Sequence, residues 1–117
     1  MGDFKRLVVW NEAHNLTIDL YTRSSRFPSL ERFGLTAQIR RAAASIGANV
    51  AEGCGRDGAG DMRRCFRIAR GSVYELEQHL MLARDLNLLT RDEWAVFDRR
   101  VQRLSRMLAG LLRMSTT

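Results

Sequence analysis

The chain has 117 residues, of which 19 are basic and 13 acidic, so its formal net charge is +6 at pH 7. This length fits one domain with a core that needs no covalent staples, and its two cysteines lack the C-x-x-C or Cys/His spacing of a disulfide framework or a zinc site. No apolar stretch approaches the roughly 20 residues that span a bilayer, and residues 7–10 are too few for a signal-peptide core, so we expect a cytoplasmic protein with no membrane anchor.

All but one of the basic residues are arginine. The planar guanidinium group suits phosphate and carboxylate recognition. A preference for arginine over lysine also arises from a GC-rich genome. Composition alone therefore indicates polyanion binding only weakly.

Apolar residues recur at steps of three and four along almost the whole chain, which predicts an all-helical protein. The first helix covers about residues 7–24. Residues 25–34, with the chain's one proline, end this helix and begin the next. The second helix should stop at Gly53, which we expect to adopt a left-handed conformation. Its apolar stripe consists of Leu35, Ile39, Ala42, Ile46 and Val50.

The third helix should run from Asp61, as its N-cap, to about Asn87, with apolar residues alternating at steps of four and three. Thr90 and Glu93 have the spacing of a capping box, so a fourth helix should begin near residue 91. Short connections between long helices predict an antiparallel, up-down-up-down four-helix bundle. We expect a single domain over residues 1–117, with a frayed tail at 113–117.

Residues 53–58 have the pattern G-x-G-x-x-G, which binds a dinucleotide pyrophosphate when it follows a β-strand and opens a helix. Here the pattern follows a predicted helix and no strand is predicted, so we expect neither a nucleotide fold nor a cofactor. The favoured interpretation is a helix stop followed by a glycine-rich connector. An alternative is that Arg56 and the arginines beyond it form an exposed cluster that contacts phosphate.

Short polar side chains share a second face of the predicted second helix, beside a ridge of small residues at 43, 47 and 51. In the third helix, Gly71 interrupts a good helical sequence at a cost of about 1 kcal/mol relative to alanine. We therefore expect close helix packing at Gly47 and Gly71 and a polar layer between the helices; the alternative to this layer is an ordinary solvated face. The hydrogen-bonded polar layer left between the helices would consist of Ser45, Asn49, Glu52, Ser72 and Glu75.

Guanidinium groups clustered on helix surfaces can bind nucleic-acid phosphates, although such stripes are more often solvated surface or pair with acids of a neighbouring subunit. One such stripe, on the third helix, contains residues 63, 67 and 70, and a second, on the fourth helix, contains residues 99, 103 and 106. The candidate nucleic-acid contacts are Arg40, Arg41, Arg56, Arg63, Arg64, Arg67 and Arg70.

No pattern indicates catalysis or a metal site. A di-iron bundle needs Glu-x-x-His pairs, which the chain lacks, so both histidines should lie at helix surfaces or boundaries. Cys65 should be a buried, inert thiol, and Cys54, in the predicted loop, exposed and oxidisable. An enzyme would require Glu52, Glu75 and an arginine to converge in a pocket, with a raised pKa on one carboxylate, so we expect no enzyme.

Three stretches resemble a small family called four helix bundle proteins, or 23S rRNA intervening sequence proteins. They are VVWNEAHNL (8–16), FPSLERFGLTAQIRRAAASIGANVAEG (27–53) and RIARGSVYELEQHLMLARDLNLL (67–89). The resemblance implies an antiparallel four-helix bundle that assembles into a homopentameric ring and has a link to RNA. It assigns no function to individual residues, and residues 57–61 of this chain are less basic than in relatives.

We therefore expect a non-enzymatic homo-oligomer, in keeping with a pentamer, that binds RNA or DNA through arginine-rich surface. The alternative is a protein–protein adaptor ring that docks an unidentified partner without binding nucleic acid.

Overall fold

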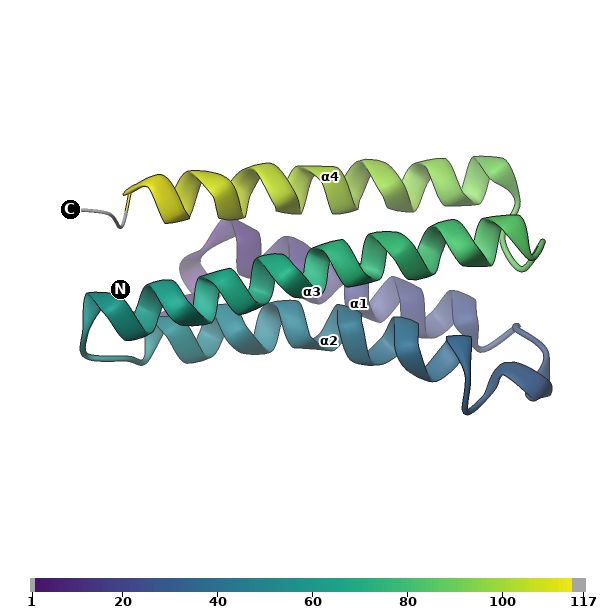
Figure 1. Cartoon of the computed structure of the whole chain (residues 1–117), viewed down its shortest axis with the longest axis horizontal. Helices are drawn as coiled ribbons and strands as arrows, with labels where there is room; N and C mark the ends of the chain where they lie inside the picture. Colours follow the sequence, from purple (N-terminus) through teal and green to yellow (C-terminus); the bar gives the residue numbers. More distant parts are fainter. Residues whose placement is uncertain (1, 115–117) are drawn as a thin grey trace.

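Four α-helices form most of the protein in a computed structural model, which describes residues 2–114. They are α1 (Val8–Ser24), α2 (Leu35–Cys54), α3 (Ala59–Asp85) and α4 (Arg91–Met114), with short 3-10 helices η1 (Phe4–Arg6) and η2 (Ser29–Glu31). No strand occurs in residues 2–114, so the all-helical prediction is confirmed. Figure 1 shows the helices side by side, with the α2–α3 turn at one end of the molecule and the other two connections at the opposite end.

The predicted apolar stripes meet in one core to which every α-helix contributes. The sequence periodicity therefore identified the inward face of each helix, because residues three and four positions apart share a helix face. The largest fully buried side chains are Leu16, Ile39, Ile46, Val50, Phe66, Val73, Leu76, Leu80, Val101, Leu104 and Leu108.

The turn between α3 and α4 follows local rules at both of its ends. The amides of Asn87 and Leu88 donate to the carbonyls of Arg84 and Ala83, and Asn87 has φ of +61°, which is the geometry of a Schellman motif. The predicted capping box is confirmed: the Thr90 amide donates to Glu93 Oε1 at 2.9 Å, and the Glu93 amide donates to Thr90 Oγ1 at 3.1 Å.

The boundaries around the glycine-rich segment differ from those predicted. α2 continues through Gly53 to Cys54, and within residues 2–114 a positive φ occurs only at Gly2 and Asn87, so Gly53 is not a left-handed helix stop. A Cβ on Gly53 would lie 2.8 Å from Phe66 Cε1, so glycine is required there by packing. α3 begins at Ala59 after Gly58, and Asp61 lies in its first turn instead of capping it.

The C-terminal boundary also differs. Residues 113 and 114 belong to α4, so the helix extends beyond the predicted start of the frayed tail. The rest of that predicted tail, residues 115–117, lies outside the described part of the chain. In the described helices, no segment is long and apolar enough to cross a lipid bilayer.

Arg23, near the end of α1, reaches the capping box at the start of α4. Its Nε donates to Glu93 Oε2 at 2.6 Å and its Nη2 donates to Glu93 Oε1 at 3.0 Å and to the Leu88 carbonyl at 3.1 Å. The hydrogen bonds from Arg23, and then from the Thr90 amide, lower the pKa of Glu93 from 4.5 to about 2.

Because this pKa is depressed on folding, the stabilisation is present above pH 4.5 and is lost as the pH falls from 4.5 towards 2. Glu93→Gln keeps a side chain that can complete the capping box and removes only the charge. At pH 7 we expect it to lower the free energy of unfolding by about 1 kcal/mol, because the pair is partly exposed. Urea denaturation from pH 7 to pH 2 should show the difference shrink below pH 4.5 and vanish as the pH approaches 2, and a constant difference would contradict this account.

Candidate functional site

Arg40, on α2, is held against α1 by three contacts. Its Nε donates to Ser24 Oγ at 2.9 Å, its Nη2 donates to the Tyr21 carbonyl at 3.1 Å, and its guanidinium carbon lies 4.7 Å from the centre of the Tyr21 ring. This half-buried arginine therefore has a fixed orientation, with part of its donor set remaining for a ligand.

Three other predicted contact residues also have partners within the chain. Arg41 forms an ion pair with Glu75 and donates to Gln38 Oε1 at 2.8 Å. Arg56 forms an ion pair with Glu52, one helical turn before it. Arg63 Nη1 donates to the Leu112 carbonyl at 2.7 Å and so joins the start of α3 to the end of α4. The charges of Arg41 and Arg56 are locally offset, so both are weaker candidates for phosphate contact.

The last three predicted arginines lie together on α3 and, within residues 2–114, take part in none of the ion pairs. Arg64 and Arg67 are exposed and Arg70 is half-buried. Their spacing places them on one side of the helix, and Tyr74, 56% exposed, continues that side one turn further on. We call Arg64, Arg67, Arg70 and Tyr74 the α3 basic face.

Tyr74 is the residue of this face that the sequence analysis missed. An exposed aromatic ring beside arginines can stack on an unpaired base while the guanidinium groups contact phosphate. Its position four, seven and ten residues after the three arginines of this helix face was a usable signal.

Gly71 lies beside Tyr74, and the prediction of close helix packing at this glycine is wrong. It is exposed, and a Cβ added there would meet no atom within 4 Å. At Gly47, by contrast, an added Cβ would lie 3.5 Å from Trp10 Nε1, so α1 does pack there at ordinary contact distance.

Three residues of the predicted polar layer form one hydrogen-bonded cluster between α2 and α3. Ser45 Oγ and Ser72 Oγ are 2.8 Å apart, and Asn49 Nδ2 donates to the Ser45 carbonyl at 2.8 Å and to Ser45 Oγ at 3.1 Å. Glu52 and Glu75 belong instead to the separate ion pairs with Arg56 and Arg41. The hydrogen bond from Arg41 lowers the pKa of Glu75, which is opposite to the raised value that acid catalysis would need.

The stripe on α4 is partly occupied by contacts with α1. Arg103 Nε donates to both carboxylate oxygens of Glu12 at 2.7 Å, and the neighbouring Arg100 Nη1 donates to Asp19 at 2.8 Å. Arg99 and Arg106 are exposed. This stripe therefore contributes to packing between α1 and α4 as well as to surface charge.

The cysteines and histidines form no reactive cluster in the described structure. Cys65 is buried as predicted, but Cys54 is also buried as the last residue of α2, so its predicted exposure is wrong; burial raises the pKa of its thiol. His14 is exposed and stacks on Trp10 with ring centres 4.7 Å apart, and His79 is half-buried on α3. In residues 2–114, no group of three His, Cys, Asp or Glu side chains is placed to hold a metal ion.

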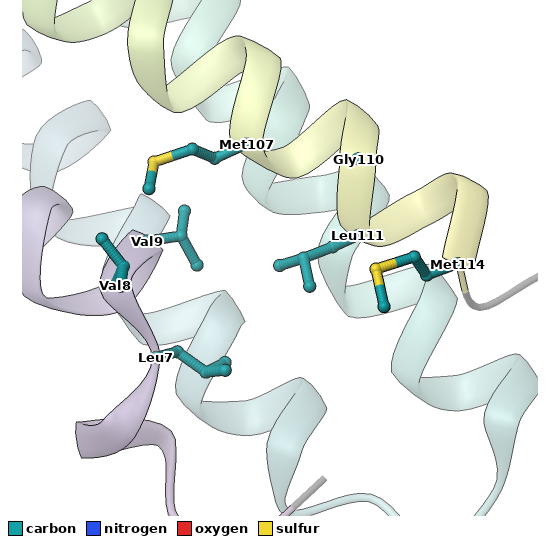
Figure 2. Close-up of a pocket in the computed structure, with 7 residues that line it drawn as sticks. All are labelled: Leu7, Val8, Val9, Met107, Gly110, Leu111 and Met114. Carbon is teal, nitrogen blue, oxygen red and sulfur yellow. The ribbon is translucent and has the colours of Figure 1, made fainter.

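An apolar groove of about 270 Å³ lies between the start of α1 and the end of α4. Figure 2 shows Leu7, Val8 and Val9 on one side of it and Met107, Leu111 and Met114 on the other. Val8 is 57% and Met114 73% exposed. Among the described residues no charged side chain lines the groove, so the chemistry that they offer is the burial of apolar surface from another molecule or segment.

Comparison with known proteins gives one family and one fold. The family model described as 23S rRNA-intervening sequence protein matches residues 5–110. No curated protein matches the chain. A crystal structure of a protein of unknown function from the S23 ribosomal protein family of Bacteroides thetaiotaomicron VPI-5482 is similar in fold: the TM-score is 0.81 at 21% identity, over 90% of this chain and 98% of that one.

Proposed function

The chain belongs to the family of 23S rRNA-intervening sequence proteins, and on that premise we propose that it is a non-enzymatic, homo-oligomeric protein that binds RNA through arginine-rich surface. The α3 basic face carries the proposal: three arginines that take part in no ion pair within residues 2–114 lie beside an exposed tyrosine. Guanidinium groups can contact phosphates while the ring stacks on an unpaired base, so single-stranded RNA is the expected ligand class.

The proposal includes an antiparallel, up-down-up-down arrangement of the four helices and a homopentamer in the cytoplasm. The alternating direction is supported by the short α2–α3 and α3–α4 connections and by the contact of Arg23, near the end of α1, with Glu93, near the start of α4. Self-association is supported by the exposed apolar groove of Figure 2, because monomeric proteins seldom leave such surface uncovered. The number of five subunits follows from the family resemblance.

Assembly would strengthen RNA binding without any new type of contact. Each protomer carries a net charge of +6, and a ring repeats the α3 basic face at fixed spacing along one RNA strand. Because phosphate binding releases counterions, the affinity should fall steeply as the salt concentration rises.

One preparation tests both assembly and RNA binding. We expect protein purified without nuclease to elute at a multiple of its 13.4 kDa chain mass and to carry nucleic acid, seen as a raised ratio of absorbance at ~260 nm to that at ~280 nm. Light scattering gives the mass, and nuclease treatment followed by repeated measurement separates the two properties. A monomer, or a flat salt dependence for RNA added back, would contradict the corresponding half of the proposal.

The apolar groove also favours a second candidate, a protein adaptor that docks a partner's apolar residue without binding nucleic acid. The adaptor would be favoured if one other protein still co-purifies after ribonuclease treatment and the chain binds no RNA at ~50 mM salt.

A further inference from the structure

A polar pocket of about 340 Å³ lies at the corner where α1 leads into α2, close to η2. In Figure 1 this connection lies at the end of the molecule opposite the α2–α3 turn. In the described part of the chain, no acidic side chain lines the pocket. The polar residues that do are Ser24 and Ser25 at the end of α1, Ser29 and Arg32 in the connection, and Thr36 and Arg40 on α2.

Thr36 indicates that the pocket accepts a polar ligand. The residue is only 7% exposed, yet its hydroxyl group makes no hydrogen bond with any other described residue. The oxygen is not enclosed by the chain: the buried side-chain polar atoms that lack a partner in the described structure are His79 Nε2 and Trp94 Nε1, so the Thr36 hydroxyl is open to the pocket. A hydroxyl group that lines a pocket without a partner from the chain is therefore available to a ligand that enters the pocket.

Two arginines give the pocket its charge. Arg40 is held in place by Ser24 and Tyr21, so little conformational entropy is lost when its remaining N–H groups bind a ligand. The guanidinium carbon of Arg32 lies 5.3 Å from the centre of the Phe33 ring, and within residues 2–114 the guanidinium group takes part in no ion pair, so its donors are available. Ser29, exposed at the rim, adds a further hydroxyl group.

The start of α2 adds a favourable field for an anion. Thr36 is the second residue of this 20-residue helix, and no side chain caps the helix from Gly34. One carboxylate lies nearby: Glu31 Oε1 accepts a hydrogen bond from the Leu35 amide at 3.3 Å. Glu31 accepts the hydrogen bond of the first amide of the helix, whereas the pocket itself is lined by two arginine side chains and four side-chain hydroxyl groups.

We propose that this corner pocket binds a terminal phosphate group. Two guanidinium groups and the Thr36 hydroxyl line the same pocket, and together they offer enough donors for the several free oxygens of a dianionic phosphate. The phosphate can come from the 5′ end of an RNA strand or from the free ion. Only the RNA source rests on the proposed function; the pocket chemistry applies to either source.

Inorganic phosphate is the probe that tests the pocket without RNA. We expect saturable shifts of the Thr36 amide signal in NMR titrations of the full chain at constant ionic strength. Thr36→Val and Arg32→Gln should each weaken binding about 10-fold or more, since a hydrogen bond to a charged group is lost. Arg26→Gln, which removes one charge from the same connection outside the pocket, should leave the affinity within about twofold.

A linear response indistinguishable from that to chloride, or equal affinities of Thr36→Val and the original protein, would overturn the proposal. Both variants are expected to remain folded, and circular dichroism checks this before each titration.

Two oligoribonucleotides of one sequence, with 5′-phosphate or 5′-hydroxyl ends, distinguish the sources. A phosphorylated strand that binds at least about fivefold tighter, with the advantage lost in Thr36→Val, identifies the RNA end as the ligand. Equal binding of both strands, together with saturable inorganic phosphate, identifies the free ion and leaves the pocket assignment in place. If the original protein binds inorganic phosphate but neither RNA strand, the proposed function is contradicted and the pocket assignment is not.

Discussion

Replacing Arg64, Arg67 and Arg70 together with glutamine is expected to weaken binding of single-stranded RNA about 100-fold at ~50 mM salt. These side chains take part in no ion pair within residues 2–114, so their charges are available to phosphate. Each phosphate contact contributes about 0.7 to the slope of log K against log salt for single strands. The triple variant should therefore lower the slope by about 2 per protomer, measured by fluorescence anisotropy across a salt series.

The matched control removes the same charge from α4 by changing Arg91, Arg99 and Arg106, which are all exposed, to glutamine. If general charge is responsible, both triple variants will lose affinity equally, and the assignment to the α3 basic face fails. Tyr74→Ala should cost a further 5-fold or more at high salt, where stacking persists, whereas Tyr74→Phe should retain most of the affinity.

Alanine at Gly53 and alanine at Gly71 are expected to change stability in opposite directions. At Gly53 the new Cβ would lie 2.8 Å from Phe66 Cε1 and 3.1 Å from Cys65 Cβ, and Phe66 is fully buried, so overpacking should lower the free energy of unfolding by about 1–3 kcal/mol. At Gly71 no described atom lies within 4 Å of the new Cβ. The helical preference of alanine should therefore raise the free energy of unfolding by about 0.5–1 kcal/mol.

Urea denaturation of the two variants, each compared with the original chain at one protein concentration, measures both effects. The pair forms its own control, because each change adds the same methyl group to a helix. Destabilisation of both variants by a similar amount would mean that Gly71 is also closely packed, for example against another subunit.

Much of the fold could be predicted because its signals are local. The capping box depends on two residues three positions apart, and the apolar stripes depend on the period of the helix, so helix boundaries were predicted to within a few residues. The predicted helix before the G-x-G-x-x-G pattern was enough to exclude a dinucleotide-binding fold, because that fold needs a β-strand there. Gly53 was misassigned because its constraint comes from Phe66, on another helix.

The candidate sites were less predictable for the same reason. The sequence placed six of the seven candidate arginines on helices and Arg56 in a connector. It could not distinguish Arg41, paired with Glu75 of another helix, from Arg67, which takes part in no ion pair within residues 2–114. The corner pocket was missed altogether, since Thr36 and Arg40 come together with Ser24 only when α1 and α2 pack.

The sequence by itself determined the four helices, their inward faces and the surplus of positive charge, since these depend on composition and on residues within one or two turns of each other. The tertiary structure alone decided which glycine is enclosed, that the Cys54 thiol is buried and which arginines remain available. Those properties depend on distances between helices, and the packing of side chains far apart in the sequence sets such distances.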